Sequence, residues 1–240
     1  MGKGLFPVLL LAALGCEPAV EEMAESTPEE RAAAGVAVTS DILGAKEQLV
    51  QEPERVDVSE LGFDLGDPDA PVKIIEFSDY ACGYCRKFHV ETLPNLTADY
   101  IETGKVSWKY IPFELGMFQN GREGALAGQC AAQQDEFFAM SDMLFERQSE
   151  WKNSSDPNPT FVGFAEELGL DGEAYSTCLG SVTALAVIRG NTQVARGLGI
   201  RGTPTFFVNG FPLQGALPEN VFRDMLDGVL SDMAEQGGGA

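Results

Sequence analysis

Beyond residue 60, stretches in which apolar residues follow strand patterns alternate with stretches in which they follow helical spacing. This predicts alternating strands and helices. The run 72–77 is short, apolar and β-branched, as in a buried strand. Apolar residues then follow helical spacing over 86–100, and Pro94 is expected to kink that helix. Strict alternation over 106–113 predicts a second strand.

The middle of the chain lacks strand signals. A helical pattern extends over 122–198 and is interrupted near 153–159 and again at 170–172. We therefore expect several consecutive helices between the second strand and the third.

A hairpin and a helix are predicted at the C-terminal end. The run 205–208 favours a third strand, and Asn209-Gly210 is a strong turn signal, so 211–213 should pair back as a fourth. Pro218 is well placed to open a last helix. The predicted apolar face of this helix comprises Val221, Phe222, Met225, Leu226 and Val229.

The N-terminus has the features of an export signal. An apolar stretch of about ten residues, too short to span a bilayer, precedes small residues and Cys16 in LLLAALGC. This segment, 1–16, resembles a bacterial lipoprotein signal in which Cys16 is lipidated, although Ala13 and Leu14 depart from the usual pattern. The alternative is an ordinary cleaved signal with Cys16 incidental. Both interpretations export the chain and permit disulfides.

Residues 17–60 are rich in Glu, Ala and Pro and contain no aromatic residue. This composition predicts an acidic flexible tether that precedes a folded domain at 61–240. A short amphipathic helix for self-association is the alternative.

Composition and charge exclude several classes of protein. Among 240 residues, 44% are hydrophobic, so the chain can build a core and is not disordered throughout. Lys plus Arg number 16 and Asp plus Glu 37, a net charge of −21. This charge argues against nucleic-acid binding and against attachment to anionic lipid through basic residues. Because His89 is the one histidine, a site built from several histidines is excluded.

A C-x-x-C motif lies where the first strand meets the first helix. Cys82 would stand at the helix N-terminus, where free N–H groups and the helix dipole stabilise a thiolate. Cys85, one turn later, could resolve a mixed disulfide at Cys82. A zinc site is the alternative, since Cys82, Cys85 and His89 share a helical face, but no second cysteine pair completes four ligands. We therefore predict a redox pair and no metal.

Two separated motifs, GDPDAPVKIIEFSDYACGYCRKF at 66–88 and RGTPTFFVNG at 201–210, resemble those of the DsbA-like branch of the thioredoxin superfamily. The resemblance covers about two-thirds of the chain, roughly 65–230. It implies an α/β thioredoxin fold with a helical insertion at about 118–198. It also implies an exported thiol–disulfide oxidoreductase that needs no cofactor.

The resemblance also implies roles for individual residues. Thr203-Pro204 matches a cis proline that faces the active-site cysteines and presents backbone to a substrate strand, with Gly83 and Tyr84 completing the substrate-binding set. Glu76 matches an acid beneath the site that helps to move the proton of Cys85. A charge in a buried strand is costly without such a role, and the alternative is that Glu76 faces solvent at a strand edge.

Cys130 and Cys178 remain after the motif is assigned. In an exported protein such a leftover pair suggests a structural disulfide, and two buried free thiols are the alternative.

Gly83-Tyr84 leaves the direction of exchange open. Tyr84 supplies no positive charge to the Cys82 thiolate, so a milder oxidant is expected than in relatives with Pro-His between the cysteines. The Gly-Tyr pair resembles periplasmic isomerases, whereas the helical insertion favours a DsbA-like oxidase, which we place somewhat ahead of isomerase or reductase.

The predicted partners are unfolded or thiol-containing exported proteins and a membrane redox partner, in the periplasm or cell envelope, with a lipid anchor at Cys16. A non-catalytic chaperone or a copper-binding lipoprotein is the competing hypothesis. A DsbA-fold transferase is a weaker one, because such enzymes generally lack the paired cysteines.

Overall fold

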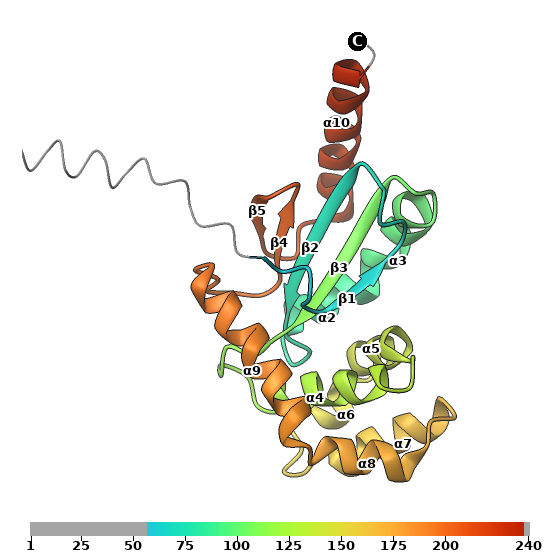
Figure 1. Cartoon of the computed structure of the whole chain (residues 1–240), viewed down its shortest axis with the longest axis vertical. Coiled ribbons are helices and arrows are strands. Elements are labelled where there is room, and N and C mark those ends of the chain that lie inside the picture. The colour runs from blue at the N-terminus through green and yellow to red at the C-terminus, as the bar shows by residue number, and fades with distance from the viewer. Residues whose placement is uncertain (1–56, 238–240) are drawn as a thin grey trace, which may run out of the picture. The chain divides into compact units, whose positions relative to one another are not determined.

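The computed structural model describes residues 57–237, which form a mixed five-stranded sheet with helices around it (Figure 1). Cys16 and the predicted signal lie outside the described residues, as does nearly all of the predicted tether. The strands are β1 (Phe63–Leu65), β2 (Val72–Ser78), β3 (Val106–Pro112), β4 (Thr205–Val208) and β5 (Phe211–Gln214). Their spatial order is β1-β3-β2-β4-β5, with β2 and β3 parallel and every other neighbouring pair antiparallel.

Around the sheet the chain is helical. The first helical elements are α2 (Gly83–Glu91), α3 (Leu93–Leu96) and the π-helical turn η1 (Thr97–Ile101). The middle of the chain forms α4 (Gly121–Ala132), α5 (Phe137–Glu146), α6 (Gln148–Trp151), α7 (Asn158–Glu167), α8 (Gly172–Leu179) and α9 (Val182–Gly197), and α10 (Glu219–Gly237) follows the hairpin. None of the helices in the described part is long and apolar enough to cross a membrane.

The predicted strands and the interrupted first helix are confirmed. The helix that begins at Gly83 stops before Thr92, and α3 restarts with Pro94 in its first turn, where its missing N–H costs nothing. The sequence pattern missed β1, which has three residues, too few for an alternating pattern to register.

Aromatic side chains fill the sheet face that α2 and α10 cover. Phe88 of α2 and Phe222 of α10 pack against each other at a centroid distance of 5.4 Å, and both contact Trp108 and Phe206. The predicted apolar face of α10 is wrong in one residue, because the side chain of Val221 is 42% exposed.

The helical segment α4–α9 packs tightly because glycines on α4 admit large neighbours. A Cβ at Gly124 would lie 2.9 Å from the ring of Trp151, and one at Gly128 would lie 3.0 Å from the Tyr80 hydroxyl. The segment therefore fits directly against the loop that follows β2, which Tyr80 occupies.

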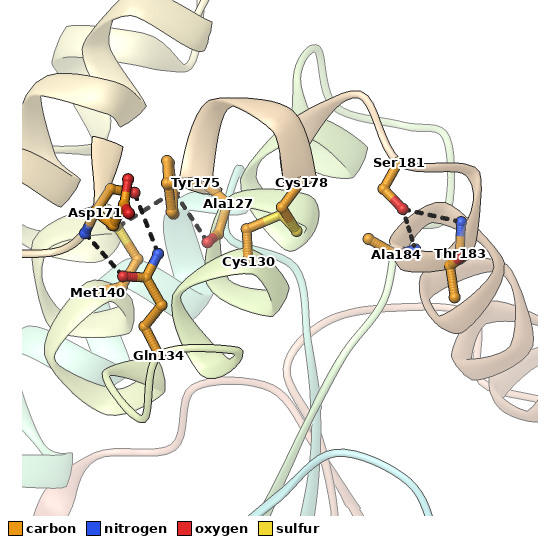
Figure 2. The surroundings of a disulfide bond; sticks show 10 residues. All are labelled: Ala127, Cys130, Gln134, Met140, Asp171, Tyr175, Cys178, Ser181, Thr183 and Ala184. Atoms are coloured by element: carbon orange, nitrogen blue, oxygen red, sulfur yellow. Dashed lines mark hydrogen bonds between the residues drawn. A yellow bond between two sulfur atoms is a disulfide. The ribbon is translucent and has the colours of Figure 1, made fainter. Parts of the chain in front are cut away.

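Cys130 of α4 and Cys178 of α8 form a disulfide, with sulfurs 2.06 Å apart (Figure 2). The alternative of two free thiols is therefore wrong. Around this bond, Tyr175 donates to the Ala127 carbonyl at 3.0 Å, and Ser181 caps α9. The bond thus joins two helices that are also held together by a buried hydrogen bond.

We expect Cys130→Ala/Cys178→Ala to lower the free energy of unfolding in urea by about 4 kcal/mol, because the bond closes a loop of 48 residues. Ser181→Ala, which removes a nearby helix cap, should cost about 1 kcal/mol and calibrates the measurement. A loss no larger than that of the cap variant would mean that the bond does not restrict the unfolded chain.

Candidate active site

Cys82 is the N-cap residue of α2, as the strand–helix junction predicts. Its N–H donates to the Asp79 carbonyl at 3.0 Å, and its own carbonyl accepts from Arg86 at 3.0 Å, which closes the first turn. Gly83 and Tyr84 form the exposed start of the helix, and the Tyr84 side chain is 71% exposed. The site therefore has a fixed backbone beneath an accessible aromatic residue.

The two cysteines of the motif are unbonded and buried. The pKa values of their thiols are shifted in opposite directions. The pKa of Cys82 is lowered to about 6, mainly by a hydrogen bond from Cys85, with Thr203 and the N–H groups of Cys85 and Tyr84 adding to the effect against desolvation by burial. Burial raises the pKa of Cys85 well above its usual value, as do the hydrogen bond and charge of Cys82. Near neutral pH the pair therefore holds one thiolate, on Cys82, and one thiol, on Cys85.

The Thr203–Pro204 peptide bond is cis and lies beside Cys82. The Cys82 thiol is 3.5 Å from the Thr203 carbonyl, to which it donates. The Thr203 hydroxyl is buried without a hydrogen-bond partner in the described residues. The structure thus brings the two sequence motifs together at the sulfur of Cys82.

Glu76 is completely buried in the central strand β2, so the alternative that it faces solvent at a strand edge is wrong. Its carboxylate is 2.8 Å from Nε2 of His89 and accepts from Nε1 of Trp108 at 3.1 Å. His89, considered above as a third metal ligand, is instead paired with this acid.

Asp79 is a second buried acid that the sequence analysis missed. Its pKa is raised to about 7, first by burial and then by the charges of Cys82 and Glu114, against a hydrogen bond from the Ala81 N–H and the charge of Lys152. One of its carboxylate oxygens has no partner among the described residues. Like Glu76, it is a charge just before the motif, and this signal could have identified it.

Gly121 is what allows Asp79 to occupy its position. A Cβ at Gly121, the first residue of α4, would lie 2.8 Å from both carboxylate oxygens of Asp79. Any larger residue there would displace the acid, so this contact explains a glycine at the start of α4.

Gln148 of α6 is the other residue that was missed. Its buried side-chain amide donates to the carbonyls of Tyr80 at 2.6 Å and Cys82 at 3.1 Å. It therefore holds the loop that carries the nucleophile. No local pattern reveals this contact, because the partners are more than 60 residues apart in the sequence.

The family model described as Thioredoxin matches residues 60–228. A putative protein-disulfide oxidoreductase of Rickettsia prowazekii is 26% identical over 70% of this chain, which spans 61% of that protein's length. A probable disulfide bond formation protein D of Bacillus anthracis is 31% identical over 61% of this chain and 69% of its own.

Among solved structures, α-DsbA1 of Wolbachia pipientis superimposes with a TM-score of 0.65 at 24% identity, over 72% of this chain and 92% of its own. BdbD of Bacillus subtilis gives a TM-score of 0.66 at 22% identity, over 73% and 95%. These similarities support the fold, and the matched family model covers most of the described residues. The chain therefore belongs to the thioredoxin family, and it is similar to proteins named as disulfide oxidoreductases or disulfide bond formation proteins.

Proposed function

We propose that this protein exchanges disulfides with exported proteins through Cys82, and that oxidation of substrate thiols is the favoured direction. The observation that carries the proposal is the lowered pKa of Cys82, to about 6. A stabilised thiolate stabilises the reduced pair, and a protein whose reduced form is stabilised is a stronger oxidant. One relative is described as a probable disulfide bond formation protein, which agrees with this direction, and another as a putative protein-disulfide oxidoreductase, a name that fits either direction.

In the oxidising direction, a substrate thiolate attacks the sulfur of Cys82 in the Cys82–Cys85 disulfide. The bond between the two cysteines breaks, and Cys85 leaves as a thiolate that takes up one proton. A second substrate thiolate then attacks the substrate sulfur of the mixed disulfide, and Cys82 leaves as a stabilised thiolate. The substrate has formed one disulfide, and two electrons have passed to the cysteine pair. A membrane redox partner is proposed to accept these electrons and reset the pair.

The other predicted site residues have supporting roles in this proposal. The Thr203 carbonyl, 3.5 Å from the sulfur of Cys82, lies where a substrate backbone would pass beside Pro204. Gly83 and the exposed Tyr84 form the adjoining surface. Glu76 is proposed to assist the transfer of a proton to and from the sulfur of Cys85. Export with lipidation at Cys16, and hence a place in the periplasm or cell envelope, stays a proposal from the sequence.

A disulfide isomerase or reductase with the same site is the second candidate, favoured by Gly83-Tyr84. A chaperone or copper-binding role would use Cys82 and Cys85 without turnover. Repeated oxidation of a dithiol peptide, coupled to reoxidation of the protein, separates the enzyme from both binding roles.

We expect the thiolate absorbance of Cys82 in the reduced protein to have its midpoint near pH 6. Since the pKa is lowered, the reduced form gains stability above this pH and loses it as the pH falls through about 6. The reduction potential against glutathione should lie between about −270 mV, as in thioredoxin, and about −120 mV, as in a strong oxidant. A midpoint near pH 9 together with a potential at or below the thioredoxin value would contradict the oxidising direction. Cys82→Ser should abolish both the absorbance change and turnover.

Glu76→Gln is expected to slow the release of Cys85 about tenfold or more and to change the pH dependence of reduction, because the variant removes a buried acid beneath α2. Stopped-flow reduction of the oxidised protein from pH 5 to 8 measures this effect. Glu150→Gln, which alters an exposed ion pair with Arg147, is the matched control and should leave the profile unchanged. An unchanged profile for the Glu76 variant would remove the proposed role.

Asp79→Asn should flatten the pH dependence of stability between pH 4 and 7. The folded pKa of Asp79, about 7, exceeds its ordinary value, so the folded state binds more protons in this range and the wild type loses stability as the pH rises. The loss is on the order of 4 kcal/mol above pH 7, by the energy of each pKa unit. Urea unfolding at pH 4 and pH 8 checks this. The free energy of unfolding of the variant should exceed that of the wild type only at pH 8. Equal stabilities at pH 8 would show that Asp79 ionises without cost.

A further inference from the structure

Asp79 lies in the turn that leads from β2 to Cys82, and both its backbone and its side chain take part in this turn. Its carbonyl accepts from the N–H of Cys82 at 3.0 Å, and its carboxylate accepts from the N–H of Ala81 at 2.9 Å. The second bond holds the carboxylate against the residue that precedes the nucleophile. The lengths of the intervening bonds therefore keep this carboxylate within about 10 Å of the Cys82 sulfur.

The start of α4 encloses the carboxylate. Asp79 is only 1% exposed, and a Cβ on Gly121 would lie 2.8 Å from both of its carboxylate oxygens. One of these oxygens has no hydrogen-bond partner among the described residues. Because the group is buried, solvent and salt screen its charge far less than they screen a charge on the surface.

The charged groups around Asp79 leave its charge without a direct counter-ion. Those that act on it are Cys82 of the motif, Glu114 after β3 and Lys152 after α6. Lys152 is the cation among them, and no ion pair within residues 57–237 includes Asp79. Arg122 of α4 pairs with Glu114 at 3.7 Å. A buried carboxylate without a counter-ion costs stability, so its presence beside a nucleophile calls for an explanation.

The redox state of the cysteine pair decides whether this carboxylate faces a second negative charge. In the oxidised protein, the Cys82 sulfur is part of a neutral disulfide. In the reduced protein it is a thiolate near neutral pH, and two like charges then lie on one short turn. Their repulsion raises the free energy of the reduced pair alone, and a less stable reduced pair is a weaker oxidant.

We infer that the Asp79 carboxylate sets the redox equilibrium of the cysteine pair by opposing the thiolate of Cys82, and so limits how strongly the protein oxidises its substrates. The inference rests on the proposed exchange at Cys82 and names a residue that controls the direction of that exchange. Asp79 is a positioning residue in this role, because its buried carboxylate acts through Cys82.

Reduction of the pair by two molecules of glutathione shows how protons and electrons balance. The Cys82–Cys85 bond breaks, one molecule of glutathione disulfide forms, and two electrons pass to the pair. Of the two thiol protons, one stays on Cys85. Burial and then the charge of Cys82 raise the pKa of Asp79 to about 7, so just below this pH the second proton goes to Asp79. At higher pH it goes to solvent, and both negative charges remain.

The test measures the equilibrium constant for reduction of the full chain by glutathione, at pH 5 and at pH 8. Asp79→Asn keeps the oxygen that accepts from Ala81 and removes the charge. At pH 8 we expect the constant to rise about three- to tenfold in this variant, by Coulomb's law over such a distance inside a protein. A tenfold rise corresponds to about 30 mV. At pH 5 the two proteins should agree, because the wild-type carboxylate is then protonated.

A second variant and a matched control separate the charge from the shape of the turn. Asp79→Ala removes the charge and the bond to Ala81 together, and it should shift the constant at pH 8 as much as Asp79→Asn does. Asp171→Asn makes the same chemical change at the start of α8, where the acid accepts from two N–H groups at 3.0 Å. This control should leave the constant unchanged.

Three results would overturn the role of Asp79. They are a wild-type constant in Asp79→Asn at pH 8, a difference from wild type that persists at pH 5, and a shift in Asp79→Ala alone, which would assign the residue to the shape of the turn. In each of these cases exchange at Cys82 still stands. If the wild type forms no mixed disulfide with glutathione at Cys82, the proposed function itself fails and this inference fails with it, before any variant is compared.

Discussion

The unequal environments of two sulfurs one helical turn apart set the chemistry of this protein. At Cys82 the neighbouring Cys85 thiol, first of all, and the first N–H groups of α2 lower the pKa and so favour a thiolate. The Cys85 sulfur lies inside the core, where burial disfavours a charge. This difference needs a helix that begins at the edge of the core. The fold provides it by ending β2 at Ser78 and starting α2 five residues later.

The helical segment α4–α9 also stabilises the junction between β2 and α2. Gln148 holds the carbonyls of Tyr80 and Cys82, and Gly121 allows Asp79 to turn inward against α4. The segment is therefore part of the site. The disulfide between Cys130 and Cys178 supports the same arrangement indirectly, because it fixes α4 to α8 (Figure 2).

Periodicity and local motifs were enough to predict the main strands, the hairpin and the start of α2. They could not reveal β1, which is too short, or the exposure of Val221, which depends on how α10 packs in the folded chain. In the site, the paired cysteines are recognisable by their C-x-x-C spacing at the start of a helix, and Glu76 is recognisable because a charge in an apolar strand is conspicuous. Gln148 is not, since an amide in a polar helical stretch becomes functional only when folding places it against a distant loop.

Some of the buried polar groups that lower the stability of the fold lie where the chemistry takes place. Of the five buried side-chain oxygens without partners in residues 57–237, two belong to Asp79 and Thr203, whose carbonyls both accept hydrogen bonds from Cys82. A core selected for stability alone would pair these groups or replace them with apolar ones. The tightly packed aromatic residues and the disulfide elsewhere allow the fold to tolerate them.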